Sequence, residues 1–292
     1  MTIEAKEIIK DCCWEIRTLL SPDECQDIRD EGSKNEIELN HATGDRRHRN
    51  NCRHLLHDPV LAELLWTRLK SLVPTEYVIC GPDGDESRSL PPGFNDGSGL
   101  ERDCQGTWNP SGVNEHFTLL YYHSNGHFGP HRDSHIVVSD HERSMLTLAV
   151  YLVDRPTNHG GATSFLRDDM DIPPVDENGR IRSPKEFVIA KVHSDEAGKA
   201  VIFTHDLLHE GEPLEVQKED GTIDESTMAA PKWLLIGQIL YKRDQTSAPE
   251  LTPQQLEARD LLRQAEEAEV QQEISKAIKL YSKAYKLDPS LE

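Results

Sequence analysis

The stretch "HFTLLYYHSNGHFGPHRDSH", residues 116–135, joins a strand pattern to an alternation of ionisable side chains. Its apolar and aromatic start is typical of a β-strand, and the Ser-Asn-Gly that follows is typical of a turn. Its end places His131, Asp133 and His135 on every second residue. Residues two apart in an extended chain share a face, so we expect His131 and Asp133 to point the same way. They are candidate metal ligands, and His135 could compete with them.

Similar short runs of β-branched and aromatic residues recur up to residue 245, separated by clusters of glycine, proline and asparagine. The later runs are "RSMLTLAVYLV", "GGATSFL", "EFVIAKVHS", "KAVIFT" and "KWLLIGQILYK". No glycine-rich phosphate loop precedes a helix in this region. The pattern therefore predicts a mainly β domain, built as an antiparallel sandwich or barrel.

A second histidine follows one of these strands. In "GKAVIFTHDLLHEGEP", residues 198–213, a glycine turn and an apolar strand precede His209, with His205 as its rival. Two histidines and a carboxylate on one face of a metal are the ligand set of non-haem iron(II) oxygenases. The next strand opens with Lys232, whose cation could hold the far carboxylate of a dicarboxylic acid that chelates the metal.

These residues resemble the 2-oxoglutarate/Fe(II)-dependent dioxygenases of the prolyl 4-hydroxylase type. The shared pattern begins with a tyrosine nine residues before His131. It continues with the strand that contains "YL", the "GGATSF" turn and the glycine-led strand before His209, and it ends with a lysine followed by an aromatic residue, here Lys232 and Trp233. The resemblance covers residues 115–245 and extends weakly to "LSPDECQDI". It implies a double-stranded β-helix, or jelly roll, with flanking helices and the metal in its mouth. It also implies site roles: iron on His131, Asp133 and His209, and 2-oxoglutarate on Lys232, Tyr122 and Tyr151.

The resemblance further implies an activity. With Fe(II), 2-oxoglutarate, O2 and ascorbate, the protein would hydroxylate a C–H bond and release succinate and CO2. A peptidyl proline or another protein side chain is the natural substrate, with small molecules as the other class. The alternatives are a catalytically inactive jelly roll that binds partners, and a cupin-like metal site that uses no 2-oxoglutarate. A nucleic-acid demethylase is disfavoured by the net charge of -20 and by a lysine at the cosubstrate position.

The sequence departs from the family between His209 and Lys232, where 22 residues, 210 to 231, intervene. The family places the lysine closer to its distal histidine. We expect "VQKEDGTIDESTMAAP", within residues 214–231, to be a solvent-exposed hairpin insertion because it is acidic and rich in turn residues. Lys218, inside this insertion, is a weaker rival to Lys232.

Upstream of residue 115 we expect two helices and a loop. Residues 7–31 are predicted helical, with Ser21 as N-cap, Pro22 after it and Gly32 at the end, and residues 58–74 form a second amphipathic helix. Residues 81–114, rich in Gly, Pro, Asp and Ser, are predicted to be a long loop. This loop and the basic "RRHRNNCR", residues 46–53, are candidate substrate-facing elements.

Residues 250–292 form a separate segment, in which Thr252 and Pro253 open the first of two predicted helices. "AIKLYSKAYKLDPSLE" resembles the second helix and closing Asp-Pro of a tetratricopeptide repeat. One repeat cannot bury its own face, so it docks on the dioxygenase domain, pairs with another chain or begins a longer array. We therefore predict a dioxygenase domain over residues 1–249, with its core at about 115–245. Residues 250–292 are predicted to be a helical, repeat-like segment, either a single repeat or the start of a longer array, and a candidate surface for a partner protein.

Composition limits the setting of the protein. Acidic residues outnumber basic ones by 52 to 32, which disfavours a nucleic-acid partner. The six cysteines form no CxxC pair, so we expect free thiols in a reducing compartment, the cytoplasm or the nucleus. The N-terminus lacks the apolar region of a secretory signal, and no stretch approaches the roughly 18 apolar residues of a membrane span.

Overall fold

The computed structural model describes residues 3–33, 45–79, 104–169 and 172–291. These residues fall into two compact units. The first is built from residues up to Tyr77 and from Asn109–Lys242, and the second from Val78, Ile79, residues 104–108 and residue 243 onward. Most of the predicted loop at 81–114 lies outside the described residues, as does Cys80.

The first unit is dominated by two antiparallel sheets. The larger has ten strands, in the order β1-β2-β13-β10-β15-β6-β5, with β7 beside β15, β4 beside β7 and β9 beside β10. Its strands are β1 (Glu4–Ile9), β2 (Cys13–Arg17), β4 (Cys52–His57), β5 (Tyr77–Ile79), β6 (Gly106–Val113), β7 (His116–Tyr122), β9 (Val137–Ser139), β10 (Glu142–Tyr151), β13 (Ala200–Thr204) and β15 (Lys232–Arg243). The smaller sheet has the order β12-β11-β14-β8-β3. Its strands are β3 (Arg49–Asn50), β8 (His127–His131), β11 (Thr163–Leu166), β12 (Val188–Val192) and β14 (His209–Gly211).

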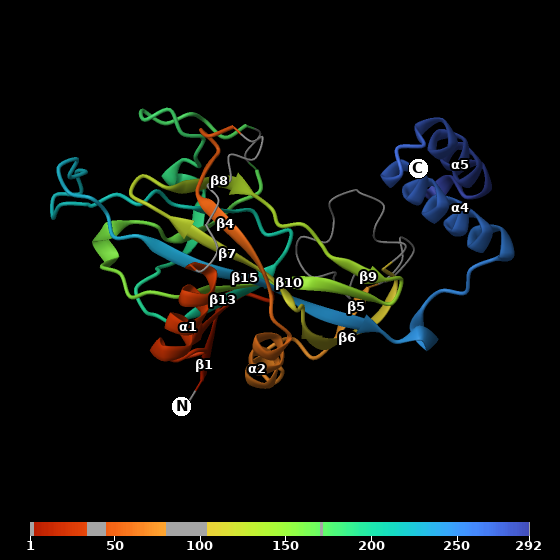
Figure 1. Ribbon diagram of the computed structural model, residues 1–292, viewed down its shortest axis with the longest axis horizontal. Helices are drawn as coiled ribbons and strands as arrows, with labels where there is room; N and C mark the ends of the chain where they lie inside the picture. Colours follow the sequence, from red (N-terminus) through yellow and green to blue (C-terminus); the bar gives the residue numbers. More distant parts are fainter. Residues whose placement is uncertain (1–2, 34–44, 80–103, 170–171, 292) are drawn as a thin grey trace. The chain divides into compact units, whose positions relative to one another are not determined.

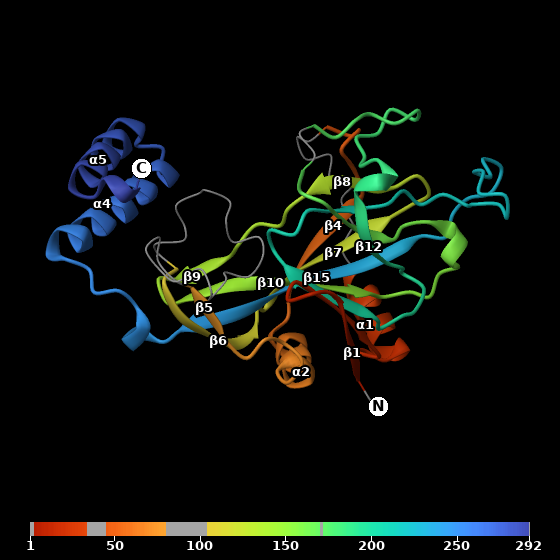
Figure 2. The same cartoon turned by 180° about the vertical axis from the view of Figure 1, so that it is seen from behind.

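The two sheets face each other across an apolar core, as a jelly roll requires. Figure 1 shows β4, β7 and β15 side by side, with β8 above them and helices α1 (Pro22–Ser33) and α2 (Pro59–Leu69) below; Figure 2 shows the same layers from behind. The core takes Phe203 and Leu234 from the larger sheet and Phe165 and Val192 from the smaller. The predicted jelly roll is therefore confirmed.

The predicted strands are confirmed, since each quoted run forms β7, β10, β11, β12, β13 or β15. The predicted helix over residues 7–31 is wrong before Ser21. There the chain forms β1 and β2, because β2 pairs with β13 and so extends the larger sheet. Beyond Ser21 the helix is confirmed, with the Ser21 hydroxyl accepting from the Glu24 amide and the Glu24 carboxylate from the Ser21 amide. It runs through Gly32, the predicted end, to Ser33.

Two other upstream predictions need smaller corrections. The second helix is confirmed and is capped by Asp58, but it ends at Leu69 instead of continuing to Pro74. The loop prediction at 81–114 is wrong over Gly106–Val113, which is strand β6. The glycine and proline in that stretch suggested a loop, whereas pairing within the sheet decides its conformation.

The second unit contains the predicted helical hairpin. α4 (Pro253–Val270) begins with a capping box at Thr252 and precedes α5 (Ile274–Leu287). Small side chains lie at the contact, since Ala258 and Ala265 of α4 and Ala277 and Ala284 of α5 are all buried. An ion pair of 3.1 Å between Arg259 and Asp288 ties the end of the hairpin to its start. The resemblance to a tetratricopeptide repeat stays a prediction, as does the domain boundary at residue 249.

Single 3-10 turns complete the secondary structure, at Thr157–His159, Lys185–Phe187, Gln245–Ser247 and Pro289–Leu291. The five cysteines within the described ranges are buried free thiols, in agreement with the prediction for them. None of the described helices is long and apolar enough to cross a bilayer.

Candidate active site

The three predicted metal ligands are brought together by the smaller sheet. His131 ends β8 and His209 begins β14, and the two residues are direct partners in the antiparallel pair. Asp133 lies two residues beyond β8, where its backbone N–H donates to the carbonyl oxygen of His205 at 3.0 Å. Their donor atoms all lie within 4.8 Å of one another, and no other such group of three occurs in the parts of the chain that the structure covers.

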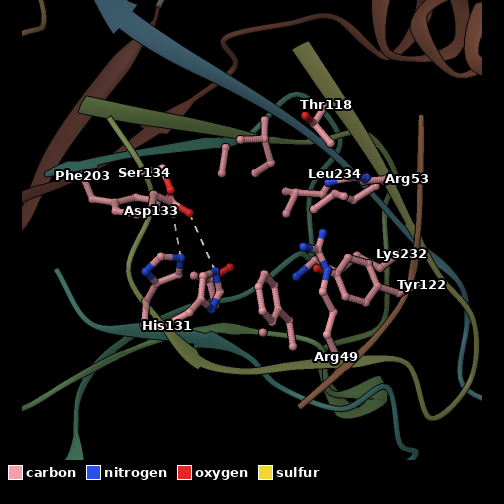
Figure 3. A pocket seen from close by; sticks show the side chains of 17 residues that line it. Arg49, Arg53, Thr118, Tyr122, His131, Asp133, Ser134, Phe203, Lys232 and Leu234 are labelled. Atoms are coloured by element: carbon pink, nitrogen blue, oxygen red, sulfur yellow. Dashed lines mark ion pairs between the residues drawn. The ribbon is translucent and has the colours of Figure 1, made fainter. Parts of the chain in front are cut away.

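The Asp133 carboxylate faces both imidazoles, and dashed lines mark the two ion pairs (Figure 3). Its Oδ1 is 3.8 Å from Nε2 of His131, and its Oδ2 is 3.8 Å from Nε2 of His209. These separations are too long for hydrogen bonds and leave space between the three donors. A single cation could be bonded by all three donors, which would occupy one side of it and leave its other side open.

Backbone contacts fix the chemical form of both histidines. Nδ1 of His131 lies 2.9 Å from the carbonyl oxygen of Gly129, and Nδ1 of His209 lies 2.9 Å from that of Leu207. A carbonyl oxygen only accepts, so each Nδ1 carries a proton, and in the neutral form of each ring the lone pair is on Nε2. Burial, with a smaller contribution from His209, lowers the pKa of His131 well below its ordinary value. The Nε2 atoms of both rings are thus the ones that can bind a cation beside Asp133.

A chain of hydrogen bonds holds the carboxylate in place. The Thr147 hydroxyl donates to Oδ2 of Asp133 at 2.7 Å and lies 2.9 Å from Nδ1 of His205. Nε2 of His205 lies 2.8 Å from the hydroxyl of Ser144. Burial, with a smaller contribution from His135, lowers the pKa of His205 to about 3, so its ring is neutral. Thr147 then accepts from Nδ1–H of His205, and Ser144 donates to its Nε2.

The rival residues from the sequence lie outside this cluster. His205 supports Asp133 through Thr147 instead of pointing at the other ligands. His135 has its Nε2 3.4 Å from Oδ1 of Asp206. Lys218 is exposed and does not line the pocket.

Lys232 lies across the pocket from the histidines and opens β15. Its side chain is 1% exposed, and its ammonium donates to the carbonyl oxygen of Gly161 at 2.8 Å. The ammonium also lies 5.3 Å from the ring centroid of Tyr122 and 5.4 Å from that of Tyr151. No carboxylate in the described residues forms an ion pair with it. Burial, followed by the charge of Arg155, lowers the pKa of Lys232 to about 7.

The two predicted cosubstrate tyrosines are placed differently. Tyr122 lines the pocket and is the register partner of Lys232, and burial raises the pKa of its phenol. Tyr151 does not line the pocket. Its hydroxyl donates to Oγ1 of Thr163 at 2.8 Å, so its contribution here is the ring against the Lys232 ammonium.

The insertion before Lys232 does not displace it. Leu214 and Ala229 belong to the apolar core, so the insertion leaves and re-enters the domain at buried positions. Between them Gln217 and Ile223 pair as a short bridge, and most of the residues around it are exposed. The predicted exposed hairpin is confirmed.

The pocket between the two sheets has a volume of about 330 Å³. Figure 3 shows His131 and Asp133 on one side and Tyr122, Lys232 and Arg49 on the other. Arg53 lines it too, so two arginines of the basic stretch at residues 46–53, which was predicted to face the substrate, reach the pocket. A basic stretch in an acidic chain is a sequence feature that draws attention to these arginines. Only the pairing of their strands shows that both side chains reach the pocket.

A protein-family model matches the part of the chain that contains the candidate site. Residues 117–234 match the family model described as the 2OG-Fe(II) oxygenase superfamily. No curated protein matches the sequence.

Among solved structures, a Pseudomonas putida prolyl-4-hydroxylase is 16% identical, with 80% of this chain and 92% of that one covered and a TM-score of 0.42. A viral collagen prolyl hydroxylase from Paramecium Bursaria Chlorella virus-1 is 15% identical, with coverages of 79% and 96% and a TM-score of 0.40. HygX from Streptomyces hygroscopicus, with nickel and 2-oxoglutarate bound, is 13% identical, with coverages of 82% and 85% and a TM-score of 0.39.

The matched stretch contains His131, Asp133, His209 and Lys232, the residues that converge on the pocket. The stretch that carries the candidate site is thus the one that is similar to the 2OG-Fe(II) oxygenase superfamily.

Proposed function

We propose that this protein binds Fe(II) through His131, Asp133 and His209 and 2-oxoglutarate through Lys232, and that it hydroxylates a C–H bond of a second substrate. Succinate and CO2 are the other products. One observation carries the proposal. Three candidate metal ligands converge on a pocket whose far wall holds a buried lysine, and no carboxylate in the described part of the chain pairs with that lysine.

The donor set fits Fe(II). Two imidazole Nε2 atoms and one carboxylate on a single side are the facial arrangement of non-haem iron oxygenases. Each ligand also makes a hydrogen bond that orients it: the two imidazoles bond to the backbone of Gly129 and Leu207, and the carboxylate accepts from Thr147. When bound, Fe(II) together with 2-oxoglutarate and O2 would supply the oxidising power for hydroxylation.

Lys232 would fix the far end of 2-oxoglutarate. A charge-assisted hydrogen bond is strongest where water is excluded, and the ammonium lies between the rings of Tyr122 and Tyr151. The Tyr122 side chain lines the same wall and would add a hydrogen bond to the cosubstrate. Phe203 and Leu234, which also line the pocket, would keep water from the reacting groups.

The second substrate is proposed to be a peptidyl proline or another protein side chain, or a small molecule of comparable chemistry. We also propose ascorbate as the reductant that maintains Fe(II), and residues 250–292 as a surface for a protein partner. The buried free thiols support a reducing compartment, the cytoplasm or the nucleus.

The test is an anaerobic titration of the metal-free protein with Fe(II) and 2-oxoglutarate, followed by visible absorption. A charge-transfer band in the wild type that weakens in Asp133→Ala and in Lys232→Ala supports the assignment. Folded protein that binds metal but gives no band with 2-oxoglutarate would contradict it. That outcome would favour the inactive, partner-binding jelly roll.

A further inference from the structure

Two arginines at the pocket have no ion-pair partner among the residues that the structure describes. Arg49 lies on β3 and Arg53 on β4, and both line the cavity that holds the candidate metal ligands. Nε of Arg49 donates to Oδ1 of Asn51 at 2.9 Å, and its guanidinium lies 4.3 Å from the ring centroid of Phe128. Within the described ranges, no carboxylate forms an ion pair with either guanidinium.

The charges of the pocket do not balance with metal and cosubstrate alone. The chain carries a net charge of -20, yet its pocket is lined by Arg49, Arg53 and Lys232 and by a single carboxylate, Asp133. A divalent metal and Lys232 are neutralised together by Asp133 and by the two carboxylates of 2-oxoglutarate. The charges of Arg49 and Arg53 are left over.

Arg49 is held in an unfavourable environment without an anion. Burial lowers the pKa of its guanidinium. Tyr122 opposes this with a smaller effect, and the charges of Arg53, which lowers the pKa, and Asp133, which raises it, contribute less. Arginine stays protonated in proteins, so the site keeps a partly desolvated cation. A planar guanidinium is suited to carboxylates and phosphates because it donates two parallel hydrogen bonds.

We propose that the second substrate carries an anionic group, a carboxylate or a phosphate monoester, which Arg49 and Arg53 bind beside the carbon to be oxidised. This rests on the proposed function and narrows its substrate to acids. The position follows from the ring of Phe128. The Arg49 guanidinium lies 4.3 Å from its centroid, and the same ring stacks on His131, with centroids 3.5 Å apart and planes at 14°. Arg49 and a candidate metal ligand thus share one aromatic neighbour, which places the anion near the metal and the carbon to be oxidised.

The test uses protein saturated with Mn(II) and 2-oxoglutarate, which does not turn over. Calorimetry measures the binding of N-acetylproline and N-acetylaspartate beside their amides, and of methyl phosphate as the phosphate probe. We expect at least one acid to bind about tenfold or more tightly than its uncharged counterpart, the scale of a hydrogen bond to a charged group. Preference for methyl phosphate over both acids would identify the anion as a phosphate.

Arg49→Gln and Arg53→Gln are expected to remove this discrimination while the affinity for 2-oxoglutarate changes little. Arg47→Gln is the matched control. It removes a guanidinium from the same basic stretch, but that side chain is exposed, pairs with Asp45 and does not line the pocket. Arg53 is also exposed, so its variant tests the proposal even if Arg49→Gln fails to fold.

Three results would overturn the inference. The two acids and methyl phosphate could all fail to bind more tightly than the amides, Arg47→Gln could have the same effect as the pocket variants, or Arg49→Gln could lose 2-oxoglutarate affinity. The last result would assign Arg49 to the cosubstrate. Failure of the proposed function itself would be distinct, because the wild type would then not bind 2-oxoglutarate in the first step.

Discussion

The protonation of Lys232 should make 2-oxoglutarate binding depend on pH. Its ammonium is buried between two aromatic rings without a carboxylate, and burial lowers its pKa from 10.5 to about 7. The dicarboxylate needs the charged form, so its apparent dissociation constant is the intrinsic one divided by the charged fraction. With a pKa of about 7, that fraction is roughly nine tenths at pH 6 and roughly one tenth at pH 8. We expect 2-oxoglutarate to bind about tenfold more weakly at pH 8 than at pH 6.

The direction of the proton change gives a second readout. Lys232 is mostly neutral at pH 8 before binding and charged afterwards, so binding at pH 8 should take up close to one proton. Calorimetry of Mn(II)-saturated protein in buffers of different ionisation enthalpy measures both the affinity and the proton uptake. The metal is kept saturating so that proton competition at the histidines does not contribute.

Two variants isolate the contribution of Lys232. Lys232→Met should bind 2-oxoglutarate weakly at every pH, and Lys232→Arg should show no pH dependence because its side chain stays charged. A wild-type affinity that is constant from pH 6 to 8 would refute the reasoning, and so would an unchanged pH profile in Lys232→Met.

Three further predictions concern the surroundings of the site. Thr147→Val removes the hydroxyl that donates to Asp133, so the affinity for Mn(II), measured by calorimetry, should fall about tenfold to a hundredfold in a folded protein; unchanged affinity would show that this hydrogen bond does not position the ligand. Tyr151→Phe removes the buried hydrogen bond to Thr163 and should lower the free energy of unfolding by about 1 kcal/mol. Because Tyr151 does not line the pocket, its 2-oxoglutarate affinity should be unchanged, and a loss would place the hydroxyl in the cosubstrate site. Gly198→Ala should destabilise the fold by more than about 1 kcal/mol in denaturant titrations, since its φ is +83° and a Cβ would lie 1.9 Å from a backbone oxygen; wild-type stability would contradict that geometry.

The strands could be predicted because their residue types and their pairing agree. Runs such as the one that forms β10 are β-branched, apolar and bounded by turn residues, and β10 is buried along almost its whole length. The segment that forms β1 and β2 misled the prediction because it mixes acidic, basic and apolar residues without a clear period. Its conformation is decided by β13, nearly two hundred residues away in sequence.

The candidate site also has a part that could be predicted from the sequence and a part that could not. His131 and Asp133 are two residues apart and His209 closely follows a glycine-led strand, so local sequence pointed to all three. Their supports could not be found locally. Thr147 reaches Asp133 from the larger sheet, and Arg49 reaches the pocket only because β3 pairs with β8.

The most direct test of the metal site is the position of a bound ion. Crystals grown with Mn(II) and 2-oxoglutarate can be measured at a wavelength where manganese scatters anomalously. The account predicts one anomalous peak within bonding distance of Nε2 of His131, Nε2 of His209 and a carboxylate oxygen of Asp133, with the far carboxylate of 2-oxoglutarate on Lys232. A peak at His135 and Asp206 instead, or 2-oxoglutarate bound away from Lys232, would contradict it.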